Sequence, residues 1–385
     1  MRRFYLSPLV IFFTSWLLAL FLYNLRISKQ FIFDFSTIIS VLSYVLLPFL
    51  FCYVFIATLS ISSQNFKLKT HFEIPFLVEK KVITRWFLFW MFVTFIEVLI
   101  SGGIPIFWYM TGSSKTYFDF GVKGLHGLMN ALLLTLSVLS FITYMVKKES
   151  FFLLFSLFII FWGVIVVARQ LVVVYLIEIM FVYCLFNTTR AILLSLYKLL
   201  FFIFIGIIAF GLIGDLRNGR DVIISISSLN VDYPDWMPSG FLWVYMYITT
   251  PLNNLFNAFV NLVPNYDFSF SKTLSSLIPS FLRNLIFGTG SAFEREWLYV
   301  SSFTVSTGFI NPFVDMGKVG VTIISSIIGL LSAFSWYKTK SGFIFINAVL
   351  LQCLVLSVFV NHFLYLPVSF QLFWYFFIVK KMRFD

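Results

Sequence analysis

The sequence predicts an all-α polytopic membrane protein of about ten transmembrane helices, with a large outer loop between the seventh and eighth. Of its 385 residues, 60% are hydrophobic and only 11% are charged, and the mean hydropathy is +0.96. Soluble globular domains carry roughly 25% charged residues. Most of the chain is therefore expected to lie in lipid.

Ten apolar runs approach the length of about 20 residues that a helix needs to cross the hydrocarbon core of a bilayer. The first run is expected to stay in the protein, because it is too long for a signal peptide and no small-residue cleavage site follows it. The runs cover residues 5–24, 37–60, 84–102, 127–146, 151–168, 171–188, 196–214, 317–337, 342–361 and 364–379.

The Lys and Arg residues between these runs predict the orientation, because positive side chains near helix ends resist translocation. With the N-terminus in the cytoplasm, sixteen of them fall on the cytoplasmic side and five in the short outer loops. Ten helices then leave both termini cytoplasmic. The predicted regions are seven transmembrane helices (1–214), an outer loop (215–315) and three transmembrane helices (316–385), with function expected to concentrate in the loop.

The outer loop contains one apolar and aromatic segment, 240–260, interrupted by Thr249, Thr250, Pro251, Asn253 and Asn254. Polar groups in mid-segment are costly in lipid. We therefore expect an interfacial or re-entrant helix, broken near Pro251, lying over the bundle. The alternative, a further full span, would place the following helices on the wrong side.

Arg169 lies in a hairpin between two spans so tight that its guanidinium must sit at the outer boundary. An arginine there departs from the positive-inside bias. It either snorkels to the lipid headgroups or forms an anion site, for which a planar and permanently charged fork suits a phosphate.

Charged residues also cluster at the start of the outer loop, in GDLRNGRD. Arg217 and Arg220 are three residues apart and are expected to face one way on a helix. Asp215 and Asp221 flank them. The cluster is either an ion-pair patch on the surface or part of a site.

Further charges follow in the loop as Arg283, Glu294, Arg295, Glu296 and Asp315. Alternating charge usually marks a solvated surface. A carboxylate among them is also a candidate general acid or base.

Glu97 is predicted about one turn inside the outer boundary, where a buried carboxylate needs a partner, most economically an arginine. His126 and His362 are the histidines expected on the outer side, and neither has a metal-binding spacing or a neighbouring acid in the sequence. The three cysteines show no paired spacing either. No metal, no cofactor and no nucleic acid is expected, since membrane orientation accounts for the net charge of +11.

Five segments together resemble the bacterial oligosaccharide repeat-unit polymerases, the Wzy-type O-antigen and capsule polymerases. The resemblance extends from about residue 90 to residue 320. The segments are FIEVLISGGIPIF, FGVKGLHGLMN, the Arg169 hairpin, WVYMYITTPLNNLFN and NPFVDMGKVG.

This resemblance implies an inner-membrane glycosyltransferase that joins undecaprenyl-diphosphate-linked repeat units on the periplasmic face. Its layout is similar to that of the GT-C-type membrane glycosyltransferases. A polysaccharide chain-length regulator is implied as a partner, beside the lipid-linked oligosaccharide and the membrane lipids.

The outer charged residues fit such chemistry. The expected diphosphate-binding residues are Arg169, Arg217, Arg220 and Arg283. The candidate general bases are Asp215, Glu294 and Asp315, with Glu97 and His126 in support. Aromatic residues of the loop are expected either to stack on sugar rings or to form an interfacial belt, namely Trp236, Trp243, Tyr245 and Tyr247.

Three other functions remain open. An O-antigen ligase would share the fold and the donor, but ligases use a histidine in the long outer loop, and residues 215–315 contain none. A flippase or other transporter would need a polar path through the bundle, where Glu97 and Glu178 are the clearest charges and no internal repeat is present. A membrane acyltransferase is the third option.

Overall fold

The computed structural model describes residues 4–62, 77–278, 282, 285–286, 297–338 and 344–381, and these residues form helices and connecting segments. The long helices of the bundle are α1 (Pro8–Asn24), α2 (Phe35–Ser62), α3 (Lys80–Ser101), α5 (Leu125–Lys147), α6 (Ser150–Ile165), α7 (Arg169–Phe186), α8 (Thr189–Asn218), α13 (Ile310–Lys338), α14 (Ile344–Leu356) and α15 (Leu366–Lys381). Shorter elements lie between them, together with one long helix, α10: η1 (Phe4–Leu6), α4 (Pro105–Met110), η2 (Tyr117–Asp119), α9 (Arg220–Ser227), α10 (Ser239–Asn261), α11 (Ser271–Leu274) and η3 (His362–Leu364).

Apolar helices occupy all ten runs predicted to cross the membrane, and they indicate a multi-pass membrane protein. Five of these helices are long and apolar enough to span a bilayer: α2, α3 extended through α4, α5, α7 and α13. Four other runs hold the shorter apolar helices α1, α6, α14 and α15, with 13 to 17 described residues each. The remaining run lies in the 30-residue helix α8, which contains the apolar stretch Ile203–Leu212. A count of ten spans therefore stays a prediction.

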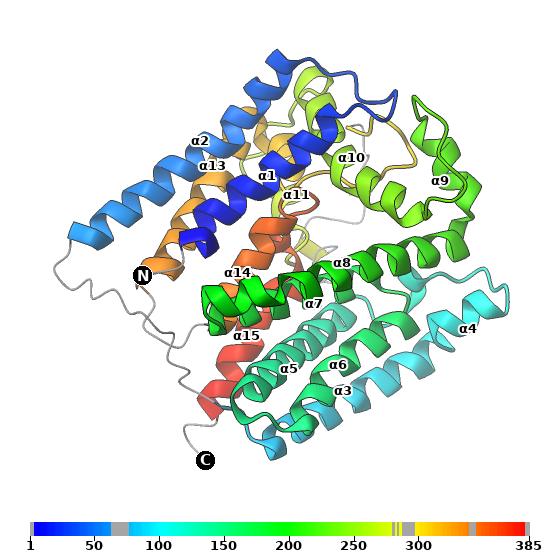
Figure 1. Ribbon diagram of the computed structural model, residues 1–385, viewed down its shortest axis with the longest axis vertical. Coiled ribbons are helices and arrows are strands. Elements are labelled where there is room, and N and C mark those ends of the chain that lie inside the picture. The colour runs from blue at the N-terminus through cyan, green and yellow to red at the C-terminus, as the bar shows by residue number, and fades with distance from the viewer. Residues whose placement is uncertain are drawn as a thin grey trace.

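The bundle has two distinct ends (Figure 1). One end, here called the loop end, carries the connections α1–α2, α3–α5, α6–α7 and α14–α15, together with α9, α10 and α11. At the opposite end α1 begins and α15 ends. The candidate residues of the hairpin and of the large loop are therefore gathered at one end of the bundle.

Helix α5 is the centre of one half of the bundle, packing against α3, α6, α7 and α15. Three of its four buried Ser and Thr hydroxyls donate to backbone carbonyls one turn earlier on the same helix: Thr135 to Ala131 at 2.8 Å, Ser140 to Leu136 at 2.7 Å and Thr143 to Leu139 at 2.9 Å. These bonds satisfy the three hydroxyls inside an apolar environment. In the other half, α2 and α13 pack closely where Gly329 meets the backbone of Phe49.

Helix α10 is continuous through Pro251, so the expected break there is wrong. Proline removes one backbone N–H from the helical ladder. Two preceding hydroxyls bind neighbouring carbonyls, with Thr249 donating to Tyr245 at 2.7 Å and Thr250 to Met246 at 2.6 Å. Packing on both sides of the proline, against α1, α2, α8 and α13, outweighs its cost.

The polar residues of α10 face protein rather than lipid. Asn254 is buried and donates to the carbonyls of Phe303 and Val305 at 2.9 and 2.8 Å. Asn253 accepts a hydrogen bond of 2.8 Å from the hydroxyl of Tyr23 in α1. These side chains therefore hold the end of the large loop and α1 against α10.

Candidate functional site

The α6–α7 hairpin places Arg169 at the loop end of the bundle. Only three residues, 166–168, separate the two helices, and Val167 adopts a left-handed conformation with φ of 56°. The helices can approach so closely because a Cβ at Gly163 would lie 2.4 Å from Val172. The tight hairpin predicted from the sequence is therefore confirmed, and it leaves Arg169 half-buried.

Aromatic rings surround the Arg169 guanidinium. Its central carbon lies 4.6 Å from the ring centre of Phe210 in α8, and 5.7 Å from those of Trp243 and Tyr247 in α10. The hydroxyl of Tyr247 accepts a hydrogen bond from Nη2 at 3.2 Å. Cation–π contacts of this kind lower the cost of enclosing the cation but do not neutralise its charge.

No carboxylate balances Arg169 among the residues that the structure describes. The ion pairs found there join Lys80 to Glu149 and His126 to Glu97. Nη1 of Arg169 is buried, and no described residue forms a hydrogen bond with it. A permanently charged guanidinium without an acidic partner raises the free energy of the folded protein. An anion is therefore the ligand that suits this site best.

Helices α8 and α10 cross at two glycines, and this crossing positions Asp215. A Cβ at Gly240 would lie 2.1 Å from the carbonyl oxygen of Ile207, and one at Gly211 would lie 2.3 Å from the nitrogen of Gly240. Larger residues would force the helices apart. The crossing brings the end of α8 against the first turns of α10.

Asp215 accepts hydrogen bonds from two side chains of α10. Ser239 donates to Oδ2 at 2.5 Å and the indole of Trp243 donates to Oδ1 at 3.1 Å. Since Trp243 also contacts Arg169, one ring joins the candidate base to the candidate anion site. A carboxylate can accept about four hydrogen bonds, so Asp215 keeps capacity for another donor.

Arg217 and Arg220 lie on different helices, so the expectation that they face one way on one helix is wrong. Helix α8 ends before Gly219, whose φ of 85° turns the chain, and Arg220 begins α9. Arg220 donates to three backbone carbonyls of segment 234–237, at 2.8 to 3.2 Å. Its guanidinium therefore holds this segment. The side chain of Arg217 lies outside the described part of the structure.

Asp315 is fully buried and holds the start of α11. It accepts hydrogen bonds from the backbone of Lys272 at 3.1 Å, and from the backbone and hydroxyl of Thr273 at 2.8 and 2.6 Å. This enclosure leaves little access for a sugar hydroxyl. The other two candidates from this part of the loop, Arg283 and Glu294, lie outside the described residues.

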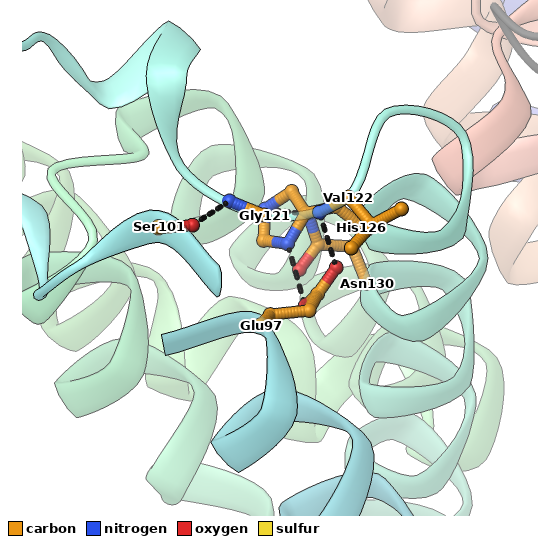
Figure 2. Close-up of polar contacts among 6 residues, drawn as sticks. All are labelled: Glu97, Ser101, Gly121, Val122, His126 and Asn130. Carbon is orange, nitrogen blue, oxygen red and sulfur yellow. Dashed lines mark hydrogen bonds and ion pairs between the residues drawn. The ribbon is translucent and has the colours of Figure 1, made fainter. Parts of the chain in front are cut away.

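Glu97 is buried between α3 and the start of α5, where it meets His126 (Figure 2). Its Oε2 lies 3.1 Å from Nδ1 of His126, and its Oε1 accepts the backbone N–H of Val122 at 3.1 Å. Asn130 lies 3.0 Å from Nε2 of the same imidazole. With Nδ1 as donor to Glu97, Nε2 is the acceptor for the Asn130 amide.

The partner of Glu97 is therefore a histidine and not the expected arginine, and His126 does have a neighbouring acid. The pairing requires a close turn: a Cβ on Gly121 would lie 2.7 Å from Cγ of His126, and Gly121 has a φ of 83°. A signal for this pair was present in the sequence. The consecutive antiparallel runs 84–102 and 127–146 place Glu97 about one turn inside the outer boundary and His126 at that boundary, within reach of each other.

The four aromatic candidates divide by exposure. Trp236 is 80% exposed and free to meet a sugar ring, whereas Trp243 and Tyr245 are buried. The hydroxyl of Tyr245 accepts the backbone N–H of Ile27 at 3.2 Å, and Tyr247 binds Arg169. Trp243, Tyr245 and Tyr247 therefore contact other parts of the protein, and only Trp236 is exposed to a ligand.

An apolar groove of about 440 Å³ lies between α3 and α6. Aromatic side chains of the two helices meet across it, as Trp90 and Trp162 do at 5.1 Å between ring centres. A groove of this chemistry suits a hydrocarbon chain.

His362 is fully buried between two glutamines. Its Nε2 lies 2.9 Å from Nε2 of Gln170, and its Nδ1 lies 2.5 Å from Nε2 of Gln352. Burial lowers the pKa of His362 from 6.5 to about 3, because the charged imidazolium is poorly solvated there. The neutral imidazole therefore links Gln170, the residue after Arg169 in α7, to Gln352 in α14.

This shift predicts a pH-dependent stability. Between the two pKa values the unfolded chain binds a proton that the folded protein does not, so the free energy of unfolding is highest above pH 6.5. It should fall by about 1.4 kcal/mol per pH unit as the pH drops below 6.5 towards 3. Thermal unfolding of wild type and His362→Gln between about pH 7 and pH 5 tests this, since the variant lacks the titrating group. Equal slopes for the two proteins would contradict the prediction.

Within the described residues, no group of three His, Cys, Asp or Glu side chains gathers as a metal site would require. Comparison with known proteins gives the chain no relatives: no protein-family model, no curated protein and no solved structure matches it. The assignment of a function therefore depends on the residues at the loop end.

Proposed function

We propose that this protein is a glycosyltransferase that joins undecaprenyl-diphosphate-linked oligosaccharide repeat units at the periplasmic face of a bacterial inner membrane, in O-antigen or capsule synthesis. One observation carries the proposal: Arg169 is a half-buried cation without an acidic partner among the described residues, at the end of an apolar bundle. A lipid diphosphate supplies the missing anion at that depth.

In the proposed reaction, the bond between the donor sugar carbon and the diphosphate oxygen breaks. A hydroxyl oxygen of the acceptor sugar bonds to that carbon, and its proton passes to a carboxylate. Arg169 stabilises the charge that develops on the leaving diphosphate. Asp215 is the preferred base, because Trp243 connects it to Arg169 and because Asp315 is enclosed.

The orientation in this proposal follows the distribution of positive charge. The loop end faces the periplasm and both termini face the cytoplasm, as sixteen cytoplasmic Lys and Arg residues against five favour. The lipid tail of a substrate would lie along the apolar helices. A chain-length regulator is the proposed protein partner.

Deleting the gene tests this function. Surface glycans should then carry single repeat units, and a plasmid copy of the gene should restore long chains. Long chains in the deletion strain would exclude a polymerase. Long chains that accumulate on the lipid carrier would instead indicate a ligase, and repeat units that never reach the periplasm would indicate a transporter.

A further inference from the structure

Glu178 is a fully buried carboxyl group that the proposed reaction does not use. It lies on α7, nine residues after Arg169, and it faces Gln371 of α15. The amide nitrogen of Gln371 donates to Oε1 of Glu178 at 2.8 Å. Gln371 is also fully buried, so water does not reach the pair from outside.

Two oxygens of this pair remain unpartnered. Oε2 of Glu178 and Oε1 of Gln371 are both buried, and neither has a hydrogen-bond partner within the described chain. If Glu178 were ionised, both atoms would be acceptors without a donor, which is costly in a low-dielectric interior. One proton between them would satisfy both.

The surroundings offer no charge to balance an ionised Glu178. Glu178 acts electrostatically on two titratable groups, the thiol of Cys353 in α14 and the phenol of Tyr175 on its own helix, and both are normally neutral at pH 7. From α5, Thr135 contributes a hydroxyl that donates to the Gln371 backbone at 3.3 Å. Among the described residues, no Lys or Arg forms an ion pair with Glu178. An unpaired carboxylate here would be strongly unfavourable.

We propose that Glu178 is a proton-binding site, and that its Oε2–H donates to Oε1 of Gln371. Together with the existing bond from the Gln371 amide, this closes a ring of two hydrogen bonds between α7 and α15. The carboxyl and the carboxamide are both planar, and each then provides one donor and one acceptor. The ring fixes the helix that begins with Arg169, whatever reaction occurs at the loop end.

A matched pair of variants tests the proton. Glu178→Gln replaces the acid by a neutral amide of the same shape, which can form the same two bonds with Gln371. Its apparent Tm in lipid nanodiscs should equal that of the wild type, and glycan chains should keep their length. Glu178→Leu leaves the buried amide of Gln371 without a hydrogen-bond partner, and Gln371→Leu does the same to the buried carboxyl of Glu178. Each should lower the Tm by about 5 °C.

The pH dependence of stability and infrared spectroscopy test whether Glu178 holds this proton. Between about pH 5 and about pH 8, the wild type should lose more thermal stability with rising pH than Glu178→Gln, because the folded wild type holds a proton that the unfolded chain has released. At neutral pH the wild type should show the carbonyl band of a protonated carboxylic acid, which the variant lacks. The proposal is overturned if Glu178→Gln is as unstable as Glu178→Leu, or if the band is absent. It is also overturned if sodium, compared with choline, selectively stabilises the wild type, because a bound cation would then replace the proton.

Discussion

Arg169→Ala is expected to lower the formation of long glycan chains by at least about 100-fold, while the protein still accumulates in the membrane. The reason is that the guanidinium is assigned to the departing diphosphate, where loss of one preorganised donor typically costs a factor of about 100 to 1,000. Arg169→Lys should recover little of this activity, because an ammonium group lacks the planar fork that binds two phosphate oxygens. Chain length on gels measures the effect.

The stability of the same variant separates a binding role from a structural one. With Nη1 unpartnered and no carboxylate balancing the cation among the described residues, removal of Arg169 should leave the Tm unchanged or raise it. Arg190→Ala is the matched control, since this exposed arginine lies near the start of α8, at the opposite end of the bundle. Wild-type chain lengths in Arg169→Ala would contradict the diphosphate site. A large fall in Tm would point to a structural arginine.

His126→Ala is expected to cause the largest loss of stability among the site variants, about 3 kcal/mol in the free energy of unfolding. It removes the imidazole that faces a carboxylate of which only 1% is exposed, and a buried charge without its partner typically costs about 3 to 5 kcal/mol. The lower value applies because the side chain of His126 is 25% exposed. Chemical unfolding in detergent measures the change.

A double-mutant cycle shows whether the two residues act on each other. Glu97→Gln keeps an oxygen for the backbone of Val122 and should cost about 1 kcal/mol. Adding His126→Ala to Glu97→Gln should cost about 1 to 3 kcal/mol less than adding it to the wild type. Additive losses would show that the pair is not coupled in solution. Lys123→Ala, a change in the same loop outside the pair, serves as the control.

The positions of the apolar helices could be predicted from the sequence, because almost every residue of a membrane span must be apolar. All ten apolar runs contain apolar helices, and both the tight Arg169 hairpin and the bend at Met316 and Gly317 fall where the runs begin or end. Helix lengths could not be predicted as well. Local packing sets where a helix ends, so α1 and α6 stop at 17 and 16 residues, short of the about 20 residues predicted for a span.

The character of α10 could not be predicted, because polarity alone does not say what a side chain faces. Thr249, Pro251 and Asn254 suggested a broken helix at the membrane surface. In the structure the helix is continuous, and the asparagine binds the backbone near Phe303, some fifty residues later. The position of α10 at the membrane surface stays a prediction. A partner so distant in the chain leaves no local pattern in a single sequence.

The candidate site could be predicted only in part, for similar reasons. The exceptional position of Arg169 was visible, since it departs from the charge bias. The roles of Arg220 and Asp315 as structural hydrogen-bonding residues were not, because they depend on carbonyls and amides supplied by other segments. Charged residues in a loop look alike in sequence whether they bind a ligand or the backbone.

The most direct test of the proposed function is reconstitution. The purified protein in lipid vesicles should convert an undecaprenyl-diphosphate-linked repeat unit, without a nucleotide sugar, into a ladder of longer lipid-linked chains, and should release undecaprenyl diphosphate. Arg169→Ala vesicles should leave the single unit unchanged. If the wild-type protein forms no ladder, or only moves the unit across the bilayer, the protein is not a polymerase.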